Sequence, residues 1–152
     1  EKIENYKGLP HFQRAVTMGA SCGVFGLMFV PTATYLDFII TFLITLVIYY
    51  GMVFLNKYEL NAFISNALLS IVMTVLAAIG GNYHIASDID TIVIGTIMIL
   101  VPGVAVTNAV RDVINGDILS GTIRTLEAFI VAFGIAFGVG ITLFFLKRGG
   151  LL

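Results

Sequence analysis

Residues 101–129 read VPGVAVTNAVRDVINGDILSGTIRTLEAF, with a Pro-Gly pair inside an apolar run and several charged side chains soon after it. Proline has no backbone N–H and its ring clashes with the carbonyl one turn earlier, so Pro102-Gly103 predicts a break in a membrane helix. The backbone groups freed by such a break are tolerated only inside protein or beside a cavity. The stretch therefore indicates both how the chain crosses the membrane and where its function lies.

The composition around this stretch is that of an integral membrane protein. Of the 152 residues, 59% are hydrophobic and 11% are charged, whereas about 25% are charged in an ordinary soluble domain. The polar stretches are too short for another domain, so residues 1–152 are predicted to form a single transmembrane domain. We expect a longer protein whose N-terminal cytoplasmic region precedes this chain. The net charge of −1 provides no basic patch for nucleic acid.

The apolar runs predict an all-α, polytopic protein with about five transmembrane helices. A helix needs about 20 apolar residues to cross the hydrocarbon layer. The last run is about 44 Å long at about 1.5 Å per residue, so it must tilt or project at the end that carries Arg124 and Glu127. The expected spans, with the fourth broken at Pro102-Gly103, are residues 14–30, 36–55, 60–80, 91–113 and 118–146.

Lysine and arginine are concentrated on one side of these five spans. The rule that cytoplasmic loops are rich in Lys and Arg then puts the N-terminus in the cytoplasm. Lys147 and Arg148 emerge on the other side, against that rule, unless the Pro-Gly segment is re-entrant or a span is miscounted. The residues that share the cytoplasmic side are Lys2, Lys7, Arg14, Lys57 and Arg111.

Two of the expected spans carry polar side chains at intervals of four, which stack along one helical face. These hydroxyls and the amide can line a wet pathway, or they can bond to helix carbonyls and to neighbouring helices. Both interpretations stay open, and Asn66, Ser70 and Thr45 are secondary candidates for pathway lining. The two sets are Thr41, Thr45 and Tyr49, then Asn66, Ser70 and Thr74.

Small residues recur at helix-packing intervals in two spans. Gly19-x-x-x-Gly23 and Gly134-x-x-x-Gly138 allow helix backbones to approach closely. The spacing fits packing within the chain, or the contact of a homo-oligomer.

The loop before the fourth span carries His84, Asp88 and Asp90, which are residue types that bind divalent metals. An aspartate there is equally suited to capping the helix that starts near Thr91. We favour the cap, and predict no metal and no cofactor.

Beyond the break, polar residues fall on two helical faces joined by a turn at Asn115-Gly116. Ionisable groups at membrane depth are costly unless paired, so they are functional candidates. Arg124 and Glu127 are three residues apart and able to pair, whereas Arg111, Asp112 and Asp117 could instead form a solvated hairpin. The candidate substrate or ion pathway comprises Pro102, Gly103, Thr107, Asn108, Arg111, Asp112, Asp117, Ser120, Arg124 and Glu127.

These residues resemble the signature of bacterial threonine/serine exporters, PG-x3-TNA-x-RD-x4-D-x2-SG-x2-R-x2-E, which the chain matches from Pro102 to Glu127. The resemblance implies a secondary transporter in the bacterial inner membrane that exports threonine or serine, proton-coupled, with a second five-span domain or subunit. Some split relatives are associated with succinate or other dicarboxylates, so a dicarboxylate exporter subunit is the alternative. A passive channel or a structural subunit also remains open.

Roles for these residues follow from their chemistry. The break supplies backbone groups, and Thr107 and Asn108 can hydrogen-bond the polar atoms of a substrate. Arg111 or Arg124 could bind a carboxylate, and Glu127 or Asp112 could carry the coupling proton. An enzyme is disfavoured, because the sequence has no recognisable pair of nucleophile and base.

Overall fold

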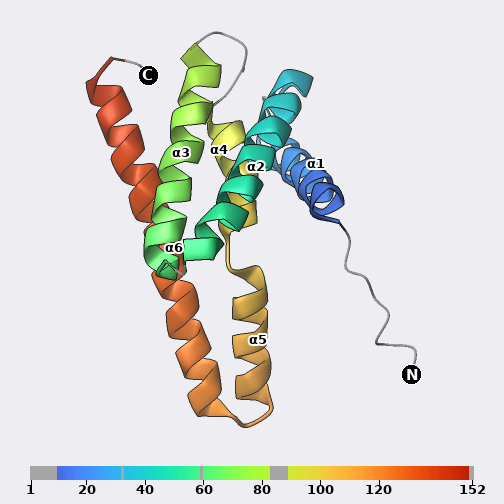
Figure 1. The fold of residues 1–152 in the computed structure, drawn as a ribbon, viewed down its shortest axis with the longest axis vertical. Helices are drawn as coiled ribbons and strands as arrows, with labels where there is room; N and C mark the ends of the chain where they lie inside the picture. Colours follow the sequence, from blue (N-terminus) through green and yellow to red (C-terminus); the bar gives the residue numbers. More distant parts are fainter. Residues whose placement is uncertain (1–9, 32, 59, 83–88, 151–152) are drawn as a thin grey trace.

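The computed structural model describes residues 10–31, 33–58, 60–82 and 89–150, and within these ranges every regular element is a helix. The predicted all-α fold is confirmed (Figure 1). The elements are α1 (His11–Phe29), α2 (Tyr35–Leu55), the short 3-10 helix η1 (Asn56–Tyr58), α3 (Ala62–Asn82), α4 (Ile89–Leu100), α5 (Gly103–Ile114) and α6 (Ile118–Arg148).

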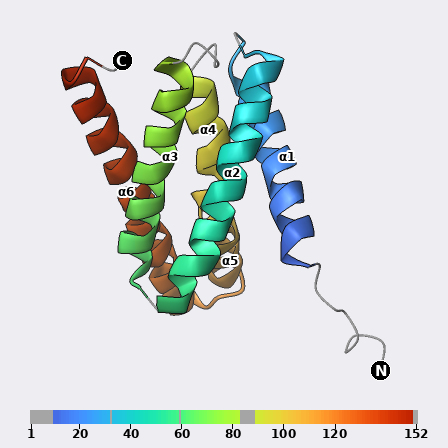
Figure 2. The same cartoon turned by 45° about the horizontal axis from the view of Figure 1, so that its top comes forward.

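The helices form two regions, a bundle that carries most of the buried core and a hairpin that extends from it. Helices α1 to α4 gather in one bundle, and the C-terminal half of α6 lies along α3 (Figures 1 and 2). Helix α5 and the N-terminal half of α6 form an antiparallel hairpin that extends past the end of this bundle (Figure 1). The hairpin therefore contains the whole signature stretch, while the bundle carries most of the apolar core.

The break at Pro102 is confirmed, whereas the count of five spans is not. Helix α4 and helix α5 are bent by 51° where they meet, and only together do they reach membrane length. Helix α1 does not qualify, because His11, Gln13 and Arg14 in its first turn shorten the apolar run. The helices long and apolar enough to cross a membrane are Tyr35–Tyr58, Ala62–Gly81 and Ile118–Arg148, and the bent pair brings the number to four at most among the described residues.

Glycines in α1 let three helices of the bundle approach closely. A Cβ atom on Gly23 would lie 2.6 Å from the Phe38 ring of α2. A Cβ on Gly95 of α4 would lie 2.8 Å from the carbonyl oxygen of Cys22 and 3.2 Å from the Cα of Gly26. The small residues of α1 are thus used within the chain, where α1 crosses α2 and α4.

The second glycine pair joins α6 to α3. A Cβ on Gly134 would lie 2.8 Å from the carbonyl oxygen of Phe63, and one on Gly138 would lie 2.6 Å from that of Ala67. Because Phe63 is the second residue of α3, the part of α6 before Gly134 extends past the start of α3. This extension is the arm of α6 that packs on α5, and it carries Arg124 and Glu127.

Candidate functional site

The turn between α5 and α6 is built by a glycine and an aspartate. Gly116 has a φ of 90°, a left-handed conformation that glycine adopts without strain. Asp117 then caps α6, because its Oδ1 accepts a hydrogen bond from the backbone N–H of Ser120 at 3.2 Å. Hydrogen bonding from the Ser120 side chain, and then from this backbone N–H, lowers the pKa of the exposed Asp117 carboxyl below its usual value. Asp117 therefore shapes the turn.

The two hairpin helices touch at Ala109 and Gly121. Ala109 is buried, and a Cβ on Gly121 would lie 2.9 Å from the carbonyl oxygen of Ala109. Any larger residue at either position would separate the helices. The alanine and glycine of the signature thus set the distance across which the polar side chains of α5 and α6 face each other.

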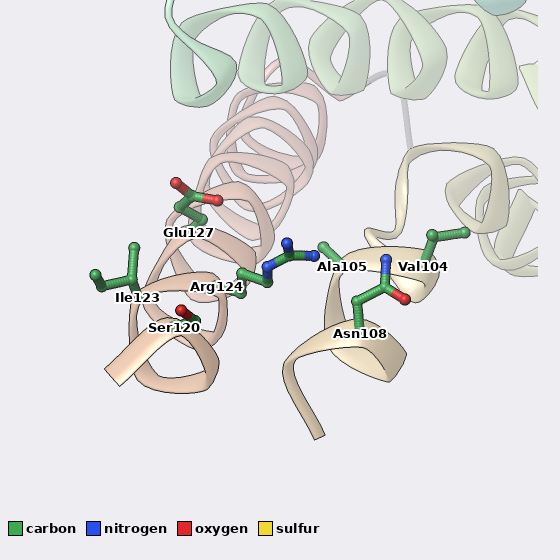
Figure 3. A pocket seen from close by; sticks show the side chains of 7 residues that line it. All are labelled: Val104, Ala105, Asn108, Ser120, Ile123, Arg124 and Glu127. Carbon is green, nitrogen blue, oxygen red and sulfur yellow. The ribbon is translucent and has the colours of Figure 1, made fainter. Parts of the chain in front are cut away.

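An ion pair connects the two helices beside this contact. The Nε of Arg124 lies 3.0 Å from Oδ2 of Asp112, with Asp112 about one quarter exposed. Figure 3 shows the guanidinium of Arg124 reaching from α6 toward α5, while the carboxylate of Glu127 points away from it. The partner of Arg124 is thus Asp112 on the facing helix. The pairing of Arg124 with Glu127 that their spacing allowed is not the one found.

A polar groove of about 580 Å³ lies between α5 and α6 (Figure 3). It brings together four of the residues predicted from the sequence, which come from both helices. The remaining walls are small or apolar. The lining residues are Val104, Ala105, Asn108, Ser120, Ile123, Arg124 and Glu127.

The other predicted residues lie around this groove without lining it. Arg111 is exposed in the last turn of α5. The hydroxyl of Thr107 donates a hydrogen bond to the carbonyl oxygen of Gly103 at 2.6 Å, so its partner lies within α5. Gly103 itself begins α5 directly after the break.

A second hollow of about 330 Å³ adjoins the groove at the start of α3. Ala105 and Glu127 line both spaces. Nothing in the residues around Asn61 singles it out, because Asn61 lies close to Glu127 only through the packing of α3 on α6. The second hollow is lined by Asn61, Ala62, Pro102, Ala105, Glu127, Ala128, Ile130 and Val131.

The secondary candidates in α2 and α3 make hydrogen bonds within their own helices. Thr45 donates to the carbonyl oxygen of Thr41 at 2.7 Å, and Ser70 to that of Asn66 at 2.7 Å. The side-chain amide of Asn66 donates to Ala62 at 2.8 Å. These contacts match the interpretation that the hydroxyls and amide bond to helix carbonyls.

The loop considered for metal binding is only partly described. His84 and Asp88 lie outside the described residues, while Asp90 is in the first turn of α4. Within the ranges that the structure describes, no three His, Cys, Asp or Glu side chains cluster to hold a metal ion.

Membrane-length apolar helices and a bent helix pair define a multi-pass membrane protein, and four of the polar residues predicted from the sequence line one groove beside the break. The particular family follows from comparison: the family model ThrE, described as "Putative threonine/serine exporter", matches residues 1–146. The chain belongs to this family of transporters. Neither the curated proteins nor the solved structures gave a match.

Proposed function

We propose that the groove between α5 and α6 binds threonine or serine during proton-coupled export across the bacterial inner membrane. The observation that carries the proposal is that Arg124 and Glu127, of opposite charge, line one groove together with Asn108. A free amino acid presents a carboxylate, an ammonium group and short polar atoms. The groove offers a complementary partner for each of these groups.

Arg124 is the residue that we assign to the carboxylate of the substrate. Asp112 contacts the Nε of Arg124, at the inner edge of the guanidinium. The two terminal nitrogens are the part of an arginine that binds a carboxylate in bidentate fashion. Asp112 thus acts as a positioning residue that holds Arg124 across the groove. Arg111, the alternative, does not line the groove.

Glu127 is the residue that we assign to the coupling proton. Asp112 is already engaged in the ion pair with Arg124, at 3.0 Å. Glu127 lies where the groove meets the second hollow. When ionised, it attracts the ammonium group of the substrate, and protonation removes this attraction and favours release. Proton uptake and substrate release are then linked at a single carboxylate.

The same carboxylate argues against a dicarboxylate as the substrate. A second carboxylate bound near Arg124 would meet the negative charge of Glu127, and like charges at short range repel. A zwitterion meets attraction at both ends. The groove therefore favours an amino acid over succinate.

A second five-span domain or subunit is proposed to complete the groove. Within the part of the chain that the structure describes, its walls come from α5 and α6 alone, so one side is left open. The tip of the hairpin also exposes large apolar side chains, with Ile114 78% and Leu119 74% exposed. Contact with another membrane chain would cover such side chains and close the groove.

The orientation of the protein in the membrane is proposed from its charges. Arg14, Lys57 and Arg111 suit a cytoplasmic face at the hairpin end, because cytoplasmic loops are rich in Lys and Arg.

The assignment is tested by counterflow in proteoliposomes that contain the complete transporter. Arg124→Gln should lower threonine exchange by about 10- to 100-fold, since hydrogen bonds to charged groups contribute about 1.5 to 3 kcal/mol. Arg148→Gln, at the far end of α6, is the matched control and should exchange normally. A normal rate for Arg124→Gln, or a greater loss for Arg111→Gln, would show that the site is elsewhere.

Glu127→Gln separates coupling from binding in the same vesicles. We expect threonine exchange to become insensitive to an imposed pH gradient, because a glutamine cannot carry the proton. Full gradient-driven export by this variant would rule out Glu127 as the coupling residue. Faster exchange of succinate than of threonine in the unmodified transporter would favour the dicarboxylate alternative.

A further inference from the structure

The two hollows of the site meet at a junction formed by two shared lining residues. Ala105 of α5 and Glu127 of α6 are the residues that line both the groove of about 580 Å³ and the hollow of about 330 Å³. Ala105 contributes only a methyl group there. A solute bound in the groove at Arg124 can therefore extend past Ala105 into the second hollow.

The spacing of the two charges orients an amino acid toward this junction. Arg124 and Glu127 are three residues apart on α6, a rise of about 4.5 Å along the helix axis. A zwitterion with its carboxylate at Arg124 has its ammonium group near Glu127 once the Glu127 carboxylate, which points away from Arg124 in Figure 3, turns toward the groove. Its Cα then lies beside the junction, and its side chain has the second hollow available.

The chemistry of the second hollow suits a short side chain that carries a hydroxyl. Ala62 and Ala128 form small apolar walls, and Asn61 supplies an amide. The Oδ1 of Asn61 accepts the backbone N–H of Phe63 at 3.0 Å. This bond fixes the rotamer and leaves the NH₂ as the end of the amide that can donate to a ligand.

We propose that the second hollow is the side-chain pocket of the transporter, with Ala105 limiting the size of the side chain and Asn61 binding its hydroxyl. The inference rests on the proposed function, because it requires an amino acid at Arg124 and Glu127. It assigns the preference for threonine and serine to residues outside the charged pair. A methyl and a hydroxyl on one carbon, as in threonine, would contact the alanines and the amide together.

Ala105→Leu tests the size limit, with Ala136→Leu on the exposed side of α6 as the matched control. The readout is inhibition of tritiated serine counterflow by unlabelled glycine, serine or threonine. Ala105→Leu should weaken inhibition by threonine about tenfold or more relative to inhibition by glycine, since one methylene in a pocket changes selectivity by about 10- to 200-fold. The control should keep the original order. An equal change for all three amino acids would overturn the size limit.

Asn61→Ser tests the hydroxyl contact. Serine retains the cap of α3, because its hydroxyl can accept the same backbone N–H, but it is too short to reach into the hollow. The ratio of inhibition by threonine to inhibition by valine should fall about tenfold, since valine has the same shape without the hydroxyl. An unchanged ratio in a variant that folds normally, as judged by gel filtration and circular dichroism, would overturn the role of Asn61.

These outcomes are separable from failure of the proposed function. Ser120→Cys, in a Cys22→Ala background, places a thiol in the groove and not in the second hollow. If threonine protects this thiol from a methanethiosulfonate reagent while the Ala105 and Asn61 variants keep their selectivity, only the side-chain pocket is refuted. If threonine and serine protect nothing and Arg124→Gln transports normally, the proposed site itself is refuted.

Discussion

The bundle and the hairpin differ in how far their side chains are buried. In the bundle, Ile48, Met73 and Ile92 have no exposed surface, and glycines bring helix backbones into contact. In the hairpin, Ala109 is the one residue of α5 that is buried. The bundle is therefore held by its own packing, whereas the hairpin leaves most of its side chains outside the core.

The hairpin also differs between its two sides. One side forms the polar groove with Arg124 and Asn108. Another hollow of about 310 Å³, which includes Val106, Val110 and Phe129, is almost entirely apolar. An amphipathic hairpin of this kind requires a polar and an apolar environment at once. It can satisfy both at a boundary between lipid and water.

The largest effect is expected from Gly95→Ala in the bundle. The added Cβ would lie 2.8 Å from the carbonyl oxygen of Cys22, and a backbone atom cannot move aside without shifting α1. We expect a loss of about 3 kcal/mol in unfolding free energy, at the upper end for overpacked sites. Gly140→Ala, where nothing lies within 4 Å of the new Cβ, should change stability by less than about 1 kcal/mol. Chemical unfolding in detergent measures the unfolding free energy of both variants. Equal losses for Gly95→Ala and Gly140→Ala would contradict a special role for the close contact between α1 and α4.

A smaller and more local effect is expected from Gly121→Ala in the hairpin. The new Cβ would meet the Val113 side chain and lie 2.9 Å from the carbonyl oxygen of Ala109. The helices of the hairpin can separate at a cost of about 1 to 2 kcal/mol without disturbing the bundle. Hydrogen exchange should rise in α5 and the N-terminal half of α6 alone. Faster exchange in α2 and α3 as well would show that the two regions unfold together.

The smallest effect is expected at Asp117, where the change is in the pH dependence of the α6 cap. Because the pKa of this carboxyl is lowered in the folded protein, its cap stabilises α6 fully above the ordinary pKa of about 3.9. That contribution is lost as the pH falls through the lowered value. Asp117→Asn can still cap the helix but should remove this acid dependence. Hydrogen exchange of the Ser120 amide, corrected for its intrinsic pH dependence, measures the stability of the cap. An identical acid response in the unmodified protein and in Asp117→Asn would contradict the role of the Asp117 carboxylate.

Several features that depend on neighbours along the chain were predicted from the sequence, although the first expected span, residues 14–30, is not among the membrane-length helices. Pro102 predicted the break, and the spacing of Ser120, Arg124 and Glu127 predicted a shared face. The partner of Arg124 was missed because it depends on the distance between α5 and α6, which Ala109 and Gly121 set. Asn61 was missed for a related reason, since α3 approaches Glu127 only through its packing on α6. The proposed roles of these residues remain predictions.

The shortness of α4 has a consequence for how the protein is made. Twelve residues rise about 18 Å, well below the roughly 30 Å of hydrocarbon, so α4 cannot enter a bilayer stably as an isolated span. It needs α1 and α2 already in place, with Gly26 meeting Gly95. We therefore expect biosynthesis to be ordered, with the segment after Leu100 held near the membrane surface until the earlier helices have assembled. If Gly95→Ala slows the packing of α4 against α1, this variant should accumulate as a protease-sensitive insertion intermediate.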